Sequence, residues 1–156
     1  METVHEQYMT ICLTLAKKAL ESSNPPVGAV LVYDDKVIGE GTESGKTTGD
    51  VTNHAEILAI RDAVANGHEG VLSGSSLYTT HEPCVMCSYA IRHHKIPLIV
   101  FSLPVKHVGG CTSEFDVLCT EHVPKWGVKP EIVQGILDSE VRELNKQFEN
   151  RETRNY

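Results

Sequence analysis

Hydrophobic residues along this chain switch between helical and strand spacing, and the switches predict its secondary structure. Apolar residues recur every three or four positions over residues 3–22, a spacing typical of an amphipathic helix. Two apolar runs follow at 27–33 and 36–39, and the Asp34-Asp35 pair between them predicts a two-residue hairpin turn. The chain therefore begins with a helix followed by an antiparallel strand pair.

Helices and strands are then expected to alternate. The polar stretch 41–50 contains three glycines and predicts a loop, and Thr52 or Asn53 is the expected cap of the next helix. We expect helices over 54–65, 84–93 and 138–149, strands over 77–80, 98–101 and 131–133, and a short helix or turn at 117–118. This order predicts one α/β domain over residues 1–156, a three-layer α/β/α sandwich with a mixed five-stranded sheet.

Composition narrows the classes of protein to which the chain belongs. Its 156 residues are 40% hydrophobic and 22% charged, a globular balance, and no apolar run approaches the roughly 20 residues of a membrane span. The first six residues lack the features of a signal peptide, so we expect a cytoplasmic protein without a membrane partner. A net charge of −7 argues against a nucleic-acid partner, which usually requires a basic surface.

Two short strings carry the chemistry, Asn53-His54-Ala55-Glu56 and Glu82-Pro83-Cys84-Val85-Met86-Cys87. Cys84 and Cys87 are three residues apart at the start of a predicted helix, where they share a face and the helix dipole favours thiolates. With His54 they form a set of three Zn²⁺ ligands that leaves a position for water. Glu56 cannot share a helix face with His54, so we predict that it carries protons rather than binds the metal.

Other interpretations of the two cysteines remain open at this stage. A Cys-x-x-Cys pair can be a redox pair or half of a structural zinc site. A structural site would need a fourth protein ligand, for which His81, His93 and His94 are the nearby candidates.

Five segments together resemble the cytidine deaminase superfamily. They are Pro26-Val27-Gly28-Ala29, Val37-Ile38-Gly39-Glu40-Gly41, His54-Ala55-Glu56-Ile57, Leu77-Tyr78-Thr79-Thr80 and Glu82-Pro83-Cys84-Val85-Met86-Cys87. The branch resembled holds tRNA adenosine deaminases, guanine deaminases and fungal cytosine deaminase. The resemblance implies the α/β/α fold, a homodimer or larger oligomer, Zn²⁺ on His54, Cys84 and Cys87, and Glu56 as the catalytic proton shuttle. It also implies a substrate pocket formed by Val27, Gly28, Ala29, Ala55, Glu82 and Pro83.

The chain departs from its relatives at positions that bear on the substrate. Glu43 stands where relatives commonly have an Asn that binds the base, so it either faces the pocket and accepts N–H groups or is an exposed loop residue. Asn24 is a candidate replacement for that amide. His81 stands where relatives have an apolar residue, so it is a candidate substrate contact, with a packing or surface role as the alternative.

Two further segments bear on the substrate. The segment 103–105 is apolar where tRNA deaminases carry charged residues, which argues against a tRNA substrate. Phe148 and Tyr156 are candidates to close the pocket, and the alternatives are a packing role in the helix core for Phe148 and a frayed chain end for Tyr156. We therefore expect zinc-dependent hydrolytic deamination of a nucleobase, a nucleoside or a related small aminated heterocycle, guanine- or cytosine-like, with release of ammonia. The alternatives are a tRNA-specific adenosine deaminase and a non-catalytic zinc-stabilised binding subunit.

Overall fold

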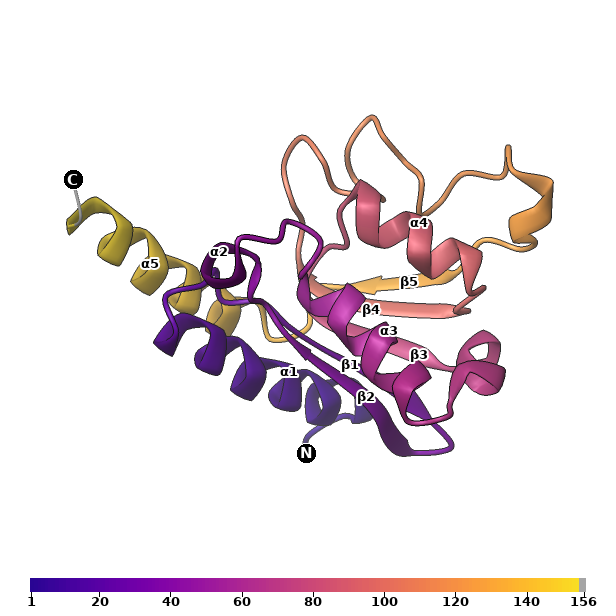
Figure 1. Ribbon diagram of the computed structural model, residues 1–156, viewed down its shortest axis with the longest axis horizontal. Helices are drawn as coiled ribbons and strands as arrows, with labels where there is room; N and C mark the ends of the chain where they lie inside the picture. The colour runs from indigo at the N-terminus through magenta and orange to yellow at the C-terminus, as the bar shows by residue number, and fades with distance from the viewer. Residues whose placement is uncertain (155–156) are drawn as a thin grey trace.

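A mixed sheet forms the centre of the protein, with helices on both faces, in a computed structural model that describes residues 1–154 (Figure 1). Its strands are β1 (Gly28–Tyr33), β2 (Lys36–Thr42), β3 (Ser76–His81), β4 (Leu98–Leu103) and β5 (Glu131–Gln134). The strand order is β2-β1-β3-β4-β5, with β1 antiparallel to both β2 and β3, and with β3, β4 and β5 parallel. The predicted mixed five-stranded sheet is confirmed.

Helices complete the two outer layers. They are α1 (Val4–Glu21), α2 (Gly45–Thr48), α3 (Ala55–Ala65), α4 (Val85–His93) and α5 (Asp138–Arg154), with 3₁₀ turns at Glu69–Gly74 and Pro124–Trp126. Figure 1 shows α1 and α5 beside each other on one face of the sheet and α3 and α4 on the other. The three-layer arrangement is therefore also confirmed. Among the described residues, no helix is long and apolar enough to cross a membrane.

Strand β1 is buried on both faces because each face packs against a helical layer. Ala29 and Leu31 join the apolar cluster that contains α3 and α4, whereas Val30 and Val32 join the cluster that contains α1. Burial on both faces explains why this strand is a continuous apolar run instead of an alternating one.

Two glycines of β2 let α3 approach the sheet closely. A Cβ atom added at Gly41 would lie 1.8 Å from the carbonyl oxygen of Ala55, and one at Gly39 would lie 2.3 Å from that of Ala59. The first turn of α3 therefore rests directly on the β2 backbone. This contact fixes the end of the helix that carries His54 and Glu56.

The structure differs from the predicted elements at several ends. Thr52 and Asn53 do not cap α3, because their side chains bond to Asp50 and Thr48 in the preceding loop, and His54 is the N-cap residue without a capping bond. The predicted loop 41–50 contains the short helix α2, and the predicted element at 117–118 is a turn.

Helix α5 continues to Arg154 instead of ending near residue 149. Its last turns are held by contacts with earlier parts of the chain. The Arg151 guanidinium donates to the carbonyl oxygen of Leu20 at the end of α1, and Glu152 pairs with Lys46 on α2. These contacts join residues more than 100 positions apart, so local sequence cannot reveal them.

Candidate active site

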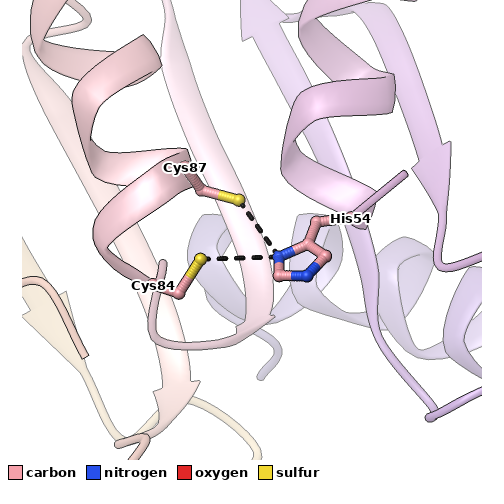
Figure 2. Close-up of side chains that lie close together, drawn as sticks. All are labelled: His54, Cys84 and Cys87. Atoms are coloured by element: carbon pink, nitrogen blue, oxygen red, sulfur yellow. Dashed lines mark hydrogen bonds between the residues drawn. The ribbon is translucent and has the colours of Figure 1, made fainter. Parts of the chain in front are cut away.

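His54, Cys84 and Cys87 converge at the starts of α3 and α4 (Figure 2). The Nδ1 atom of His54 lies 3.4 Å from Sγ of Cys84 and 3.5 Å from Sγ of Cys87. Tetrahedral zinc, with Zn–N near ~2.0 Å and Zn–S near ~2.3 Å, separates nitrogen and sulfur ligands by about 3.5 Å. The three side chains therefore fit a zinc ion, and Nδ1 is the ligand atom of His54.

Electrostatics at this triad favour a cation. The hydrogen bond with Cys87 and the contact with His54 lower the pKa of Cys84 to about 4. The same hydrogen bond, together with burial, raises the pKa of Cys87, so this thiol holds its proton beside the Cys84 thiolate. The Cys84 thiolate raises the pKa of His54 to about 9. A metal ion would take the place of these shared protons, so its binding is coupled to proton release.

Glu56 lies beside the triad without belonging to it. Its carboxylate is only 4% exposed, accepts a hydrogen bond of 2.8 Å from the Thr79 hydroxyl, and lies 3.6 Å from Sγ of Cys87. Burial raises the pKa of Glu56 to about 7. A carboxyl group with a pKa near neutrality is suited to accept and release protons at pH 7.

A structural zinc site would require a fourth protein ligand, and the described residues supply none. The ligand atoms that lie within 4.8 Å of one another come from His54, Cys84 and Cys87 alone. His81 bonds to Thr80 and Asn145, and His93 stacks on Tyr89 near the opposite end of α4. The remaining coordination position is thus open to water, as in catalytic zinc sites.

A cavity of about 190 Å³ opens beside the triad. It is lined by Val27, Glu43, His54, Glu56, His81, Glu82, Cys84, Val105 and Val108. The structure thus brings four predicted substrate contacts to the cavity, namely Val27, Glu43, His81 and Glu82. Thr79, Val108 and Asn145 support the site but were not singled out from the sequence, because no local pattern distinguishes them from packing residues.

The other four predicted substrate contacts lie outside the cavity lining. Ala29 and Ala55 are fully buried in the core between the sheet and α3, and Gly28 packs closely against α1. The carbonyl oxygen of Pro83 accepts hydrogen bonds from Gly110 N and Ser88 Oγ. Each of these positions is used in packing or in holding the neighbouring loop, and a substrate contact there stays a prediction.

Glu82 lines the cavity, but its carboxylate is committed to the loop that follows β4. This 2%-exposed group accepts four hydrogen bonds of 2.6–2.9 Å, from the backbone N–H groups of Val105, Cys111 and Thr112 and from the Thr112 hydroxyl. Its role in the structure is therefore to hold the loop that forms one wall of the cavity.

Glu43 faces the cavity and is not an exposed loop residue. It is 8% exposed, its Oε2 atom accepts a hydrogen bond from Gly45 N, and its backbone N–H bonds to Val27. Burial raises the pKa of its carboxyl group. Asn24 does not replace it, because the Asn24 side chain bonds to Thr47 and is absent from the lining.

The remaining candidates are used in packing. Leu103 is 6% exposed and packs against α1 and α5, while Val105 lines the cavity. Phe148 packs against the same cluster beneath the Lys46 ammonium group and is absent from the cavity lining, so of its two candidate roles it has the packing role. Tyr156 lies outside the described residues.

Comparisons with known proteins agree with this geometry. Residues 2–103 match the family model of the cytidine and deoxycytidylate deaminase zinc-binding region. The chain is 38% identical over 128 residues to the tRNA-specific adenosine deaminase of Aquifex aeolicus, covering 80% of this chain and 85% of that protein. It is 32% identical over 156 residues to tRNA-specific adenosine deaminase 2 of Xenopus tropicalis, covering 96% and 91%.

A solved structure from a study of A-to-I editing by tRNA:A34 deaminases superposes with a TM-score of 0.80 at 33% identity, covering 88% of this chain and 98% of that one. The matched region contains all three zinc ligands and Glu56. The fold, the metal-binding triad and the family match agree with one another, and the protein is a zinc-dependent hydrolytic deaminase that belongs to the cytidine and deoxycytidylate deaminase family.

Proposed function

We propose that the protein deaminates adenosine to inosine in transfer RNA. The observation that carries this proposal is the similarity over nearly the whole chain to proteins named tRNA-specific adenosine deaminase, in bacteria and in vertebrates. The A-to-I editing structure, which superposes over 88% of the chain, supports it further. The small cavity, about 190 Å³, would take a single base turned out of the RNA strand.

The expectation of a free nucleobase or nucleoside as the substrate is wrong, because the relatives are named for tRNA. The apolar segment 103–105 suggested the error. Leu103 is apolar because it packs under α5, not because the surface avoids RNA. The apolar composition of segment 103–105 therefore results from packing in the core and gives little information about the substrate.

The argument from net charge against a nucleic-acid partner is likewise not supported. A net charge of −7 is a sum over the whole surface, whereas RNA contacts are local. Lys46 lines a depression of about 470 Å³ that shares Glu43 and His54 with the cavity. Arg142 and Lys146 line another of about 220 Å³ on α5. Basic side chains therefore gather in two depressions despite the acidic total, and one of these depressions shares residues with the cavity.

The residues of the site divide the work of the reaction among them. His54, Cys84 and Cys87 would hold Zn²⁺, which when bound supplies Lewis acidity that brings the pKa of a water molecule toward ~7. Glu56 removes a proton from the attacking water and delivers it to N1 of the adenine ring. Glu56 then takes a second proton from the oxygen now bonded to C6 and delivers it to the amine, so that the C6–N bond breaks, ammonia leaves and the C6 carbonyl of inosine forms. Thr79 holds the Glu56 carboxylate in place during both transfers.

Inosine formation on an anticodon stem-loop RNA tests the proposal, with free adenosine, guanine and cytosine as comparison substrates. We expect inosine from the RNA, and a loss of about 10²–10⁴-fold in the Glu56→Gln variant at unchanged zinc content. A protein that releases ammonia from a free base and leaves the RNA unchanged would contradict the proposal.

Three further properties accompany the proposed function. We take residues 1–156 as one catalytic domain, because the apolar clusters on both faces share the same sheet. A homodimer is supported by Tyr89 on α4 and by Val108 and Phe115 on the loop after β4, which are exposed apolar residues, and light scattering would measure it. A tRNA substrate fits a location in the cytoplasm.

A further inference from the structure

His81 makes two hydrogen bonds that fix both its orientation and its tautomer. Its Nε2 atom lies 2.9 Å from Oδ1 of Asn145, and its Nδ1 atom lies 2.8 Å from Oγ1 of Thr80. An amide oxygen only accepts hydrogen bonds, so Nε2 carries the proton and Nδ1 accepts from the Thr80 hydroxyl. The Thr80 oxygen in turn accepts from Gly28 N at 3.2 Å. Every polar atom of the imidazole is therefore bonded within the protein.

This bonded pair connects the cavity to the C-terminal helix. His81 is the last residue of β3 and lines the cavity, and Asn145 belongs to α5. Asn145 also lines the depression of about 220 Å³, together with Leu103, Arg142, Lys146 and Glu149. The His81–Asn145 pair thus separates the base-sized cavity from a depression with two basic side chains.

Other contacts of α5 lead away from the cavity. Val141 and Leu144 pack against residues of α1, and Arg151 bonds to the end of α1. These contacts hold the helix on the sheet. They do not join it to a residue that lines the cavity, as the bond from Asn145 to His81 does.

We propose that His81 and Asn145 form a positioning pair that ties α5 to the edge of the cavity and orients the His81 ring against the target nucleotide. Both ring nitrogens are bonded internally, so His81 offers the substrate its carbon edge and ring face rather than a hydrogen bond. A ring held at both nitrogens is preorganised, and preorganisation lowers the cost of binding. The pair therefore acts on substrate affinity and not on the chemical step, and this role rests on the proposed RNA substrate.

A set of variants separates this role from simple packing. Asn145→Leu leaves the Nε2–H of His81 without a partner, His81→Leu removes the ring, and the double variant removes both groups. His81→Gln keeps a donor near the Nε2 position, and Asn150→Leu changes an exposed Asn on the same helix as a matched control. Each variant is assayed for KM and kcat on the anticodon stem-loop, after zinc content and the thermal midpoint have been measured.

We expect each single Leu variant to raise KM about tenfold with kcat within about twofold, because each breaks the hydrogen bond that preorganises the ring for binding. The double variant should raise KM by about the same tenfold, because the two residues act through one hydrogen bond that either single change has already removed. The KM of His81→Gln should stay within about threefold of the wild-type KM, and the KM of Asn150→Leu should equal the wild-type KM.

The outcomes distinguish the two proposals. Unchanged KM in the single variants, a multiplicative effect in the double variant, or a loss confined to kcat would overturn the positioning role. If a Leu variant does not fold, His81→Gln decides: a KM raised far beyond threefold overturns the role of the donor. A wild-type protein that forms no inosine from the RNA refutes the proposed function itself.

Discussion

Glu56 illustrates how a single residue acquires its chemistry from its surroundings. The residue opens α3 as its second position, where its carboxylate is buried beside Cys87 and Thr79. Burial is the largest influence on its pKa and raises it, whereas the Thr79 hydroxyl bond lowers it. The position of the proton on Glu56 therefore depends on a residue that does not touch the metal.

Thr79→Val removes this hydrogen bond and preserves the shape of the side chain. We expect kcat/KM for inosine formation to fall about tenfold and the free energy of unfolding to fall by about 1 kcal/mol, because a buried acceptor loses its donor. Steady-state kinetics and urea denaturation measure the two effects. Thr153→Val, on the exposed surface of α5, is the matched control, and equal effects of both variants would contradict the role of Thr79.

At the scale of single residues, the sequence predicts the reactive residues better than the residues that hold them in position. His54, Cys84, Cys87 and Glu56 can be recognised because zinc chemistry requires those residue types at fixed spacing. The bond between His81 and Asn145 joins positions 64 residues apart and forms only when α5 docks on the sheet.

Among the secondary-structure elements, α3 depends most directly on the backbone of the sheet. Its first turn carries His54 and Glu56 and lies against Gly41, where a Cβ atom would be 1.8 Å from the Ala55 carbonyl oxygen. The Ala55 oxygen is a backbone atom and the added Cβ would be fixed on the Gly41 backbone, so neither atom can rotate away. The position of two active-site residues thus depends on the absence of a side chain in β2.

Gly41→Ala should push the start of α3 away from β2. We expect a loss of at least about 2 kcal/mol in the free energy of unfolding, in the range of overpacked cores, together with weaker zinc binding. Gly70→Ala is the control, because a Cβ atom there meets nothing within 4 Å. Chemical denaturation and a competition assay with a zinc-binding dye measure both quantities, and unchanged zinc affinity in Gly41→Ala would contradict the argument.

Hydrophobic periodicity predicts the existence of the main elements but not their ends. The ends of α3 and α5 differ from expectation because contacts with side chains distant along the chain determine where these helices begin and end. At the end of α5, for example, Glu152 pairs with Lys46. The loop after β4 has no periodicity of its own. It is shaped by the Glu82 carboxylate and by Arg92, whose guanidinium donates to three of its carbonyl oxygens.

For the molecule as a whole, the distribution of charge matters more than its sum. The chain has 14 Lys and Arg residues against 21 Asp and Glu, yet Arg142 and Lys146 meet in one depression next to the His81–Asn145 pair. Arg142 already pairs with Asp138, whereas Lys146 forms no ion pair with any described residue. Lys146 is therefore the available cation for an RNA phosphate beside the cavity, although Glu149 lies in the same depression.

Lys146→Gln should weaken binding of the anticodon stem-loop and reduce its dependence on salt. We expect the slope of log K against log salt concentration to become shallower by about 0.7–0.9, the contribution of one phosphate contact. Lys36→Gln is the control, because Lys36 lies in the hairpin at the end of β1 opposite to Gly28. Equal slopes for wild type and Lys146→Gln would show that no phosphate is bound there.

The residues of the site are synthesised at different times, because they lie in different parts of the chain. Every metal ligand and Glu56 lie within the first 87 residues, whereas Asn145 belongs to the last helix. A chain synthesised as far as Cys87 contains the complete donor set while β4, β5 and α5 are still to be made. The metal ligands and Glu56 are thus synthesised before Asn145, the residue that we propose to position His81.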